Sequence, residues 1–425
     1  MNIASRGASM AVDWEQRVDF VRLRADRLAR AKAALNASEL GAVLLFDQNN
    51  IRYVTATHIG EWARDKSARC VLLPRNGDPV LWDFGSAAKH HQLYAPWLPE
   101  SSWQAGVTSM RGAMPRASGV PDLLAGHIYD VLDDNGLLDE PVGIDLTDME
   151  TLASLGRRGI ATGDAAPVMQ EARKIKSADE IALLDQAAGI VDAVYQQIYE
   201  TLRPGVREHE IVADAQRLLF ELGSEQVEAI NAVSGDRCSP HPHVFSDRLL
   251  RPGDQAFFDI IHSFMGYRTC YYRTFSVGGT NPGQLAAYKQ CREWLDDSIE
   301  LIRPGVTTDR IASVWPTAKE LGFPDEESCF GLQFGHGIGV GLYEAPMISR
   351  LNSFEDPIEI EVGMVFALET YCATRDGSGA ARIEEEIVVT EEGPEVITRF
   401  PAQELLVCGR QYVRGADIVG DRVEV

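Results

Sequence analysis

Two segments in the second half of the chain repeat one another. LRPGVREHEIVADAQRLLFELG at 202–223 and IRPGVTTDRIASVWPTAKELG at 302–322 each place a Pro-Gly turn after an apolar run, and each close on Leu-Gly. Each copy predicts the end of one helix, a turn and a second helix, so we expect a duplicated helix–helix–strand unit. Two copies are too few to form a solenoid. The repeat therefore favours a single pseudo-symmetric domain.

The first part of the chain alternates helix and strand signals. Apolar residues recur at helical spacing from about 13 to 39. AVLLFDQNNIRYV at 42–54 predicts a strand, a turn and a second strand. CVLLPRNGDPVLWDF predicts a hairpin that turns at Asn76–Gly77. This alternation is typical of an α/β domain.

A domain boundary is expected before the long helix that precedes the first repeat. PVGID at 141–145 predicts a strand, and Thr147 is the expected N-cap of the helix after it. Ser177 followed by Glu180 is the signature of a capping box and marks the start of the long helix. With 425 residues, two domains are expected. The predicted division is a flexible arm at 1–12, an α/β domain at 13–174 and a second domain at 175–425.

Composition excludes several classes of partner. The net charge of −23 repels nucleic acid and anionic membrane surfaces. No apolar run approaches the roughly 20 residues of a membrane span, and the N-terminal residues lack the apolar core of a secretory signal. The seven cysteines are scattered singly, which argues against a disulfide framework and a tetrathiolate zinc site. We therefore expect a cytoplasmic protein.

Polar side chains interrupt the predicted strands of the second domain. FFDIIHSFMGYRTCYYRTF at 257–275 predicts a hairpin folded about Met265–Gly266, with Asp259 on one arm and Cys270 on the other. His336 lies in GHGIGVGLYEAP, where glycines allow backbone or ligand to approach closely.

A second predicted hairpin, MVFALETYCATRDGSGAARIEEEIVV, carries Glu369 on one arm and Glu384 on the other. Strand alternation places Glu384 and Glu386 on one face and Glu385 on the other, so acidic side chains must point inward. A buried carboxylate costs several kcal/mol unless it is paired or binds a cation. Convergence of these segments predicts a divalent-metal site; the alternative is that each acid is a solvated strand residue.

The order of these segments resembles the pita-bread superfamily of methionine aminopeptidase, aminopeptidase P, prolidase and creatinase. The segments are FFD…GYRTCYYRTF, GHGIGVGLYEAP, MVFALET and RIEEEIVVTEEG. The first domain resembles the creatinase-type N-terminal domain. The resemblance implies an α/β (α+β) fold, a homodimer and a metallopeptidase-like hydrolase that cleaves a C–N bond of a small amino-acid-like or dipeptide substrate.

The resemblance also implies a set of metal ligands: Asp259, His336, Glu369 and Glu384, with Cys270 standing where the family has a second, metal-bridging Asp. Thiolates bind zinc and iron well but bridge a pair of hard ions poorly. We therefore expect one divalent ion per chain (Zn, Fe or Mn) rather than two, or no metal.

The family's remaining catalytic residues map onto this sequence with changes. Tyr343 stands where the peptidases have a His before a Glu-x-Pro motif, and either His241 or His243 falls near the position of another catalytic His. Glu369 or a histidine is the expected base. His262 and Trp62 are predicted to contact substrate, Trp62 by reaching a neighbouring subunit's pocket.

Three other functions stay open at this stage. The first is a metal-free creatinase-like amidinohydrolase acting on a small cationic substrate. The second is a lyase related to the dimethylsulfoniopropionate lyase, although Leu342 stands where that enzyme has its Asp base. The third is a pseudo-enzyme that serves as a binding module.

Overall fold

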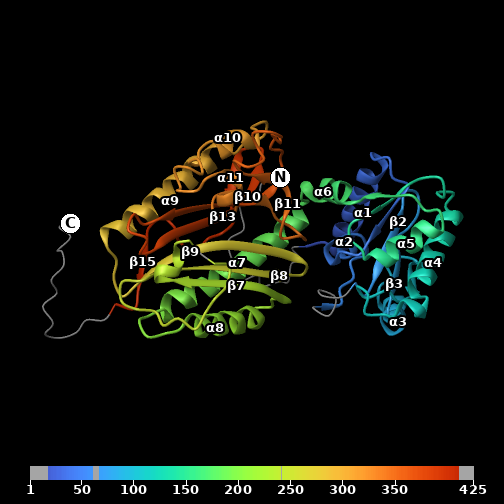
Figure 1. Ribbon diagram of the computed structural model, residues 1–425, viewed down its shortest axis with the longest axis horizontal. Coiled ribbons are helices and arrows are strands. Elements are labelled where there is room, and N and C mark those ends of the chain that lie inside the picture. The colour runs from blue at the N-terminus through green and yellow to red at the C-terminus, as the bar shows by residue number, and fades with distance from the viewer. Residues whose placement is uncertain (1–17, 61–66, 241, 411–425) are drawn as a thin grey trace, which may run out of the picture.

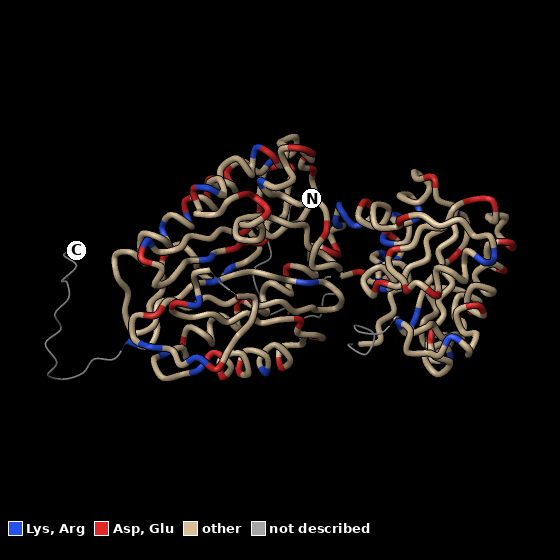
Figure 2. The backbone as a smooth tube through the Cα atoms, in the orientation of Figure 1, with Lys and Arg blue, Asp and Glu red and all other residues tan. Residues whose placement is uncertain are grey.

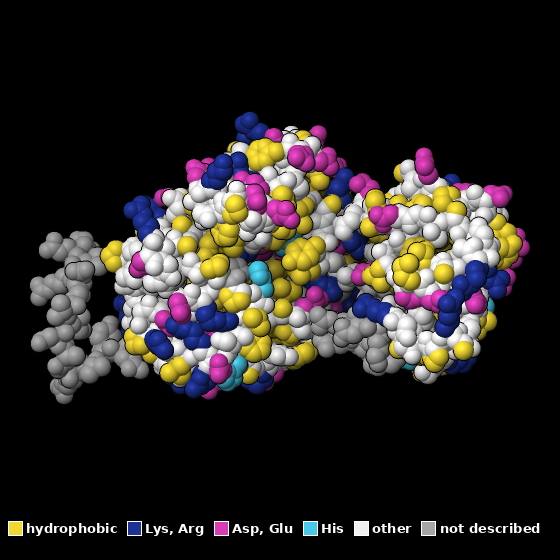
Figure 3. Space-filling view, in the orientation of Figure 1, with side chains coloured by type: hydrophobic (Ala, Val, Ile, Leu, Met, Phe, Trp, Pro, Cys, Tyr) yellow, Lys and Arg dark blue, Asp and Glu magenta, His cyan; other side chains and the backbone are white. Residues whose placement is uncertain are grey.

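The computed structural model describes residues 18–60, 67–240 and 242–410. Its two lobes follow one another along the chain, and α6 lies where they meet (Figure 1). The predicted arm at 1–12 lies outside the described residues. Acidic and basic positions are interspersed along both lobes (Figure 2), and acidic side chains are spread over the visible face of each (Figure 3). Within the described ranges, no helix is long and apolar enough to cross a membrane.

The first lobe is built on one six-stranded sheet with the order β4-β3-β2-β1-β5-β6. Its strands are β1 (Ala42–Leu45), β2 (Cys70–Pro74), β3 (Val80–Asp83), β4 (Trp103–Ala105), β5 (Val142–Ile144) and β6 (Thr162–Asp164). Its helices are α1 (Phe20–Asn36), α2 (Gln48–Thr55), α3 (Gly85–Tyr94), α4 (Val120–Asp134), α5 (Met149–Arg157) and α6 (Ala166–Lys174). Alternate residues of β1 face opposite sides: Val43 packs toward α1, α2 and α6, whereas Leu44 packs toward α4 and α5.

In the first lobe, the sequence correctly predicted one hairpin but did not predict where two helices begin. β2 and β3 pair antiparallel, as the Asn76–Gly77 turn predicts. The second strand expected within 42–54 is instead α2, because the Asp47 side chain accepts hydrogen bonds from two backbone N–H groups and caps a helix there. The helix after 145 is capped by Asp148 rather than by Thr147.

The second lobe contains two sheets. One has the order β15-β9-β8-β7 and the other the order β11-β10-β12-β13-β14. The first comprises β7 (Gln226–Ser234), β8 (Gln255–Phe264), β9 (Tyr267–Val277) and β15 (Leu406–Cys408). The second comprises β10 (Phe334–Gly337), β11 (Glu344–Ile348), β12 (Val365–Ala373), β13 (Ala380–Thr390) and β14 (Gly393–Val396). The sheets meet along β9 and β13. There the Thr274 hydroxyl donates a hydrogen bond to the Arg382 carbonyl and accepts one from the Arg382 N–H.

Helices cover the outer side of each sheet of the second lobe (Figure 1). These are α7 (Ala178–Thr201), α8 (Glu208–Glu221), α9 (Pro282–Leu301), α10 (Thr308–Ala312) and α11 (Glu326–Cys329). α7 and α8 pack on the first sheet, and α9 and α10 pack on the second. The capping box of Ser177 and Glu180 at the start of α7 is confirmed. The prediction that the second helix of 302–322 runs to the closing Leu-Gly is wrong. α10 ends at Ala312, before Pro316, which has no N–H for a helical hydrogen bond.

The predicted hairpins carry the polar positions to the inner faces of these sheets. β8 and β9 turn at Met265–Gly266, where both residues have positive φ angles of 48° and 93°. On β12 and β13, Leu368 and Ile383 pack outward against α9, so the next residue of each strand, Glu369 or Glu384, faces inward.

Candidate active site

Asp259 and Cys270 lie side by side on the first hairpin. The Cys270 thiol donates to Asp259 Oδ1 at 3.4 Å, and Asn231 Nδ2 donates to Asp259 Oδ2 at 3.0 Å. Burial raises the pKa of both the Asp259 carboxyl and the Cys270 thiol, and the Asp259 charge raises that of the thiol further. Both side chains are therefore positioned by partners before any cation binds.

His336 is held as a neutral imidazole. Its Nδ1 lies 3.1 Å from the carbonyl oxygen of Gly337, which can only accept, so Nδ1 carries the proton. Burial lowers the pKa of His336 to about 4. The unprotonated Nε2 faces Glu384, with 4.0 Å to Oε1, and is free to donate its lone pair to a metal.

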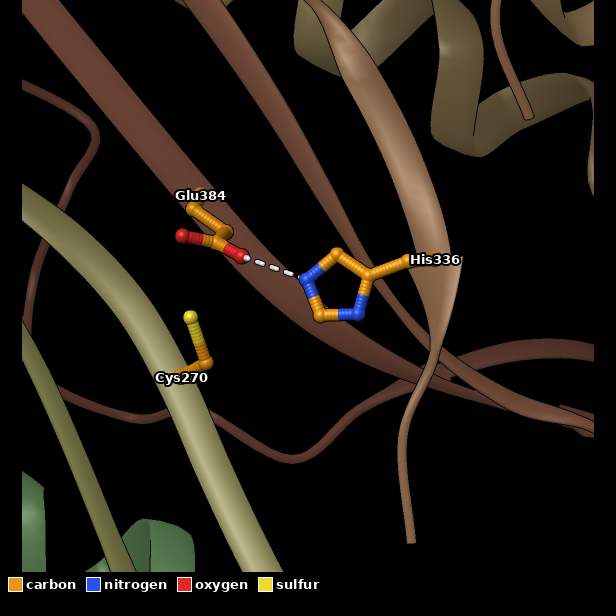
Figure 4. A group of neighbouring side chains, drawn as sticks. All are labelled: Cys270, His336 and Glu384. Carbon is orange, nitrogen blue, oxygen red and sulfur yellow. Dashed lines mark ion pairs between the residues drawn. The ribbon is translucent and has the colours of Figure 1, made fainter. Parts of the chain in front are cut away.

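Cys270, His336 and Glu384 converge on one point (Figure 4). One ligand atom from each lies within 4.8 Å of the others, and all three residues are buried. Both Glu384 oxygens are buried without a hydrogen-bond partner. Burial, then the charges of Glu369 and Asp259, raise the pKa of Glu384 well above its usual range. An unpaired buried carboxylate beside a thiol and an imidazole is a donor set that fits one divalent ion.

Glu369 has a different partner, which the sequence did not reveal. Arg382 Nε donates to Glu369 Oε2 at 2.9 Å, and the guanidinium lies 4.3 Å from the centre of the Tyr272 ring. Burial and the Asp259 charge raise the pKa of Glu369 to about 7, although Arg382 opposes them. Strand alternation is the sequence feature that points to Arg382. This residue precedes Glu384 by two positions and therefore lies on the same face of β13.

The remaining predicted site residues divide into two groups. The Tyr343 ring lies 4.8 Å from that of His336 and is 56% exposed, at the mouth of the site. His243 is at the surface, and partial desolvation together with the Arg382 charge lowers its pKa. His262 faces away from Asp259 and contacts Ser224 Oγ and the Ala187 carbonyl, each at 3.0 Å, so we leave it out of the site.

Two other predictions, His241 and Trp62, fall outside the described residues.

The glycine-rich segment after His336 encloses the carboxylate of Glu344. Gly341 N donates to Glu344 Oε1 at 2.7 Å, and a Cβ on Gly339 would lie 2.5 Å from Oε2. Lys176 Nζ lies 3.0 Å from Oε2 and Arg173 Nε 3.2 Å from Oε1. The residues at and just after the end of α6 thereby fix the loop that presents Tyr343.

Comparison with known proteins identifies the family. Metallopeptidase family M24 matches residues 182–391. The uncharacterized peptidase YqhT of Bacillus subtilis is 30% identical over 258 residues, which is 58% of this chain and 69% of the relative. The chain belongs to metallopeptidase family M24. The probable dipeptidase PepE of Mycobacterium bovis is 27% identical to this M24 protein over 395 residues, 90% of this chain and 96% of the relative.

Solved structures confirm the expected fold. The Xaa-Pro dipeptidase from Bacillus anthracis superposes with a TM-score of 0.70 at 22% identity, over 90% of this chain and 99% of that one. The α/β pita-bread fold is thus confirmed. Membership of family M24 confirms the identification as a metallopeptidase-like hydrolase. Which residues bind a metal stays a prediction.

Proposed function

We propose that this M24 protein is a dipeptidase of the prolidase type that binds a single divalent ion through Cys270, His336 and Glu384. The observation that carries the proposal is the convergence of these three ligand atoms within 4.8 Å, with both Glu384 oxygens buried and unpaired. Glu369 is excluded from this group because its carboxylate already pairs with Arg382. The similarity to a probable dipeptidase over nine-tenths of the chain supports a small peptide substrate.

The donor set favours zinc or iron. A thiolate, an imidazole nitrogen and a carboxylate suit a borderline ion, whereas Mn²⁺ and Mg²⁺ prefer all-oxygen sites. Asp259, beside Cys270, is the residue that can complete the coordination. When bound, the ion supplies Lewis-acid polarisation of the substrate's amide carbonyl.

The chain's own residues supply proton transfer and orientation. Glu369, with a pKa near 7, is suited to accept the proton of an attacking water at neutral pH. Burial and the surrounding acids raise the pKa of Tyr343, so its hydroxyl stays protonated and can donate to the oxygen of a developing tetrahedral centre. We assign to His243, whose pKa is lowered by partial burial and by the Arg382 charge, the transfer of the proton taken up by Glu369 to the leaving amine.

Metal content and substrate screening test this proposal together. Purified protein should contain about one zinc or iron per chain and lose dipeptidase activity with a chelator. Glu384→Gln should lose the metal, while Glu395→Gln on the neighbouring strand β14 should keep it. The substrate panel compares Xaa-Pro and other dipeptides with guanidino compounds and sulfonium or betaine compounds.

The alternative functions are outcomes of the same panel. Active protein with metal content far below one per chain would reject the metal-dependent proposal. Turnover of guanidino compounds would then identify a creatinase-like amidinohydrolase, and turnover of sulfonium compounds a lyase. Loaded protein that is inert with every substrate would favour a binding module. The proposed assembly is a homodimer, which sedimentation velocity measures directly.

A further inference from the structure

A cavity of about 250 Å³ lies in the first lobe between α1, α2 and the segment at 97–98. Its walls combine the aliphatic surface of Leu28, the rings of Tyr53 and Trp97, and the guanidinium groups of Arg24 and Arg27. None of these residues belongs to the catalytic group. The cavity is therefore a separate feature that peptide hydrolysis does not explain.

The two arginines in this cavity lack carboxylate partners. Arg27 is 4% exposed, yet within the described ranges neither it nor Arg24 forms an ion pair with an acidic side chain. The Nε atoms of both are buried without a hydrogen-bond partner. The nearest acids act on the two arginines from beyond ion-pair distance, Asp19 on Arg24 and Glu180 on Arg27. Arg27 Nη1 lies 3.5 Å from the hydroxyl of Tyr267, which donates to Glu180 Oε1 at 3.0 Å.

The buried arginines elsewhere in this chain differ in their ion pairs, although among the described residues Nε of Arg69 and of Arg173 is likewise without a hydrogen-bond partner. Each of four has a carboxylate within ion-pair distance: Arg69 with Asp83, Arg173 with Glu344, Arg273 with Glu385 and Arg382 with Glu369. An unpaired buried charge costs several kcal/mol, so folded chains pair such groups with an ion or ligand. Arg24 and Arg27 stand one turn apart on α1, and the charge of Arg27 adds to burial in lowering the pKa of Arg24. The cavity therefore presents two guanidinium groups that no carboxylate of the described residues contacts.

The aromatic walls orient the guanidinium groups. Arg24 Cζ lies 4.5 Å from the centre of the Trp97 ring, and Arg27 Cζ lies 5.7 Å from that of Tyr53. Trp97 is fixed by its own hydrogen bond to the Thr55 carbonyl at 2.8 Å. Stacking occupies one face of a guanidinium and leaves its N–H edge available to oxygen acceptors.

We propose that this cavity binds a small organic oxyanion, with a carboxylate or phosphate group on Arg24 and Arg27 and an apolar body against Leu28 and Trp97. The volume suffices for a ligand of this kind, because a dry cavity of about 150 Å³ already admits benzene. Carboxylate and phosphate share the planar, multidentate recognition that arginine provides. Binding here is independent of the proposed peptidase activity.

Isothermal titration with four probes tests both parts of the ligand. Benzoate and phenyl phosphate each present an oxyanion on an aromatic ring, benzyl alcohol lacks the charge, and inorganic phosphate lacks the ring. We expect at least one of the first two to bind at one site per chain, and the last two to bind at least about tenfold more weakly. The stronger of the first two identifies the oxyanion. Failure of both benzoate and phenyl phosphate to bind at millimolar concentration would overturn the proposal.

Arginine variants locate the binding. Arg24→Met and Arg27→Met should each weaken the association by at least about tenfold, whereas Arg217→Met, an exposed arginine on α8, should leave it unchanged. Arg24 is only partly buried, so we expect Arg24→Met to fold. This variant alone tests the assignment if Arg27→Met folds poorly. Probe binding that is equal in wild type and both cavity variants would place the anion elsewhere and refute the assignment.

Discussion

At the residue scale, the proposal that the centre holds a single ion depends on the thiol of Cys270. The resemblance predicts that Cys270 stands where the related peptidases have a metal-bridging Asp. Its thiol donates to Asp259 Oδ1 at 3.4 Å. Cys270→Asp supplies a hard bridging ligand beside Asp259 and Glu384. We expect its metal content to rise from about one to about two ions per chain in Mn²⁺, with increased dipeptidase activity. Elemental analysis measures the first effect without reference to turnover.

Serine at the same position provides the control for this prediction. Cys270→Ser keeps the size of the side chain but offers neither a thiolate nor a carboxylate, so we expect it to retain less than one ion per chain after dialysis. Cys372→Ser, on the same lobe but outside the ligand group, should match wild type. A Cys270→Asp protein that still binds one ion would show that the Arg382–Glu369 pair, rather than the thiol, limits the site.

His262 makes a second residue-scale prediction, for stability. Burial lowers its pKa to about 4 from 6.5, so the folded state disfavours the charged imidazole. The resulting stability is present above pH 6.5 and is lost as pH falls toward 4. Between pH 7 and 4.5 the unfolding free energy of His262→Gln should therefore fall by about 2–3 kcal/mol less than that of wild type. Urea titrations at both pH values measure this difference; identical pH dependences would contradict it.

At the element scale, the glycine loop between β10 and β11 depends on the residues that follow α6. Lys176 is buried and lies 3.0 Å from Glu344, whereas Lys174 is half-buried and lies 3.0 Å from Glu361, whose side chain is exposed. Lys176→Met removes one partner of a buried charge and should cost about 3 kcal/mol, against at most about 0.5 kcal/mol for Lys174→Met. Chemical denaturation compares the two. Equal effects would mean that Glu344 does not hold the loop.

Local signals predicted the elements that carry the site but not all of their contacts. The Met265–Gly266 turn, the second hairpin and the capping box of α7 each depend on neighbouring residues, and the structure has all three. Alternation places Arg382 on the same face as Glu384, but its pairing with Glu369 could not be predicted, because the pairing depends on which residues of β12 and β13 lie opposite one another. The helix at 48–55 was missed for a different reason. Its composition is strand-like, but the side chain of Asp47 caps a helix there.

At the scale of the whole molecule, charged pairs join the two lobes. Arg22 Nε lies 2.7 Å from Asp179 Oδ2, and Arg52 Nη1 lies 2.6 Å from Glu225 Oε1. The Glu225 carboxylate also accepts from Gly266 N at the hairpin turn. The first lobe therefore contacts both the turn of β8 and β9 and, through Arg173, the loop that presents Tyr343. These contacts make it a structural support for the catalytic lobe.

The charge balance of the catalytic lobe leads to a prediction about pH and metal removal. Burial raises the pKa of Glu369 to about 7 and that of Glu386 to about 8, from a usual 4.5. An acid with a raised folded-state pKa stabilises the fold below pH 4.5, and that stabilisation is lost as pH rises through the folded value. The metal-free protein should therefore become less stable between pH 5.5 and 8.

Calorimetry with and without Zn²⁺ measures this effect. We expect the Tm of the metal-free protein to fall by at least about 4 °C over that range, since 1 kcal/mol corresponds to about 2–4 °C in a domain of this size. Zn²⁺ should reduce the fall, because a cation held by Cys270, His336 and Glu384 lies within electrostatic range of Glu369 and Glu386 and favours their ionised forms. Glu386→Gln should show a shallower fall in the metal-free state. Parallel pH profiles with and without Zn²⁺ would mean that no cation binds near the buried acids, and the single-ion centre would have to be abandoned.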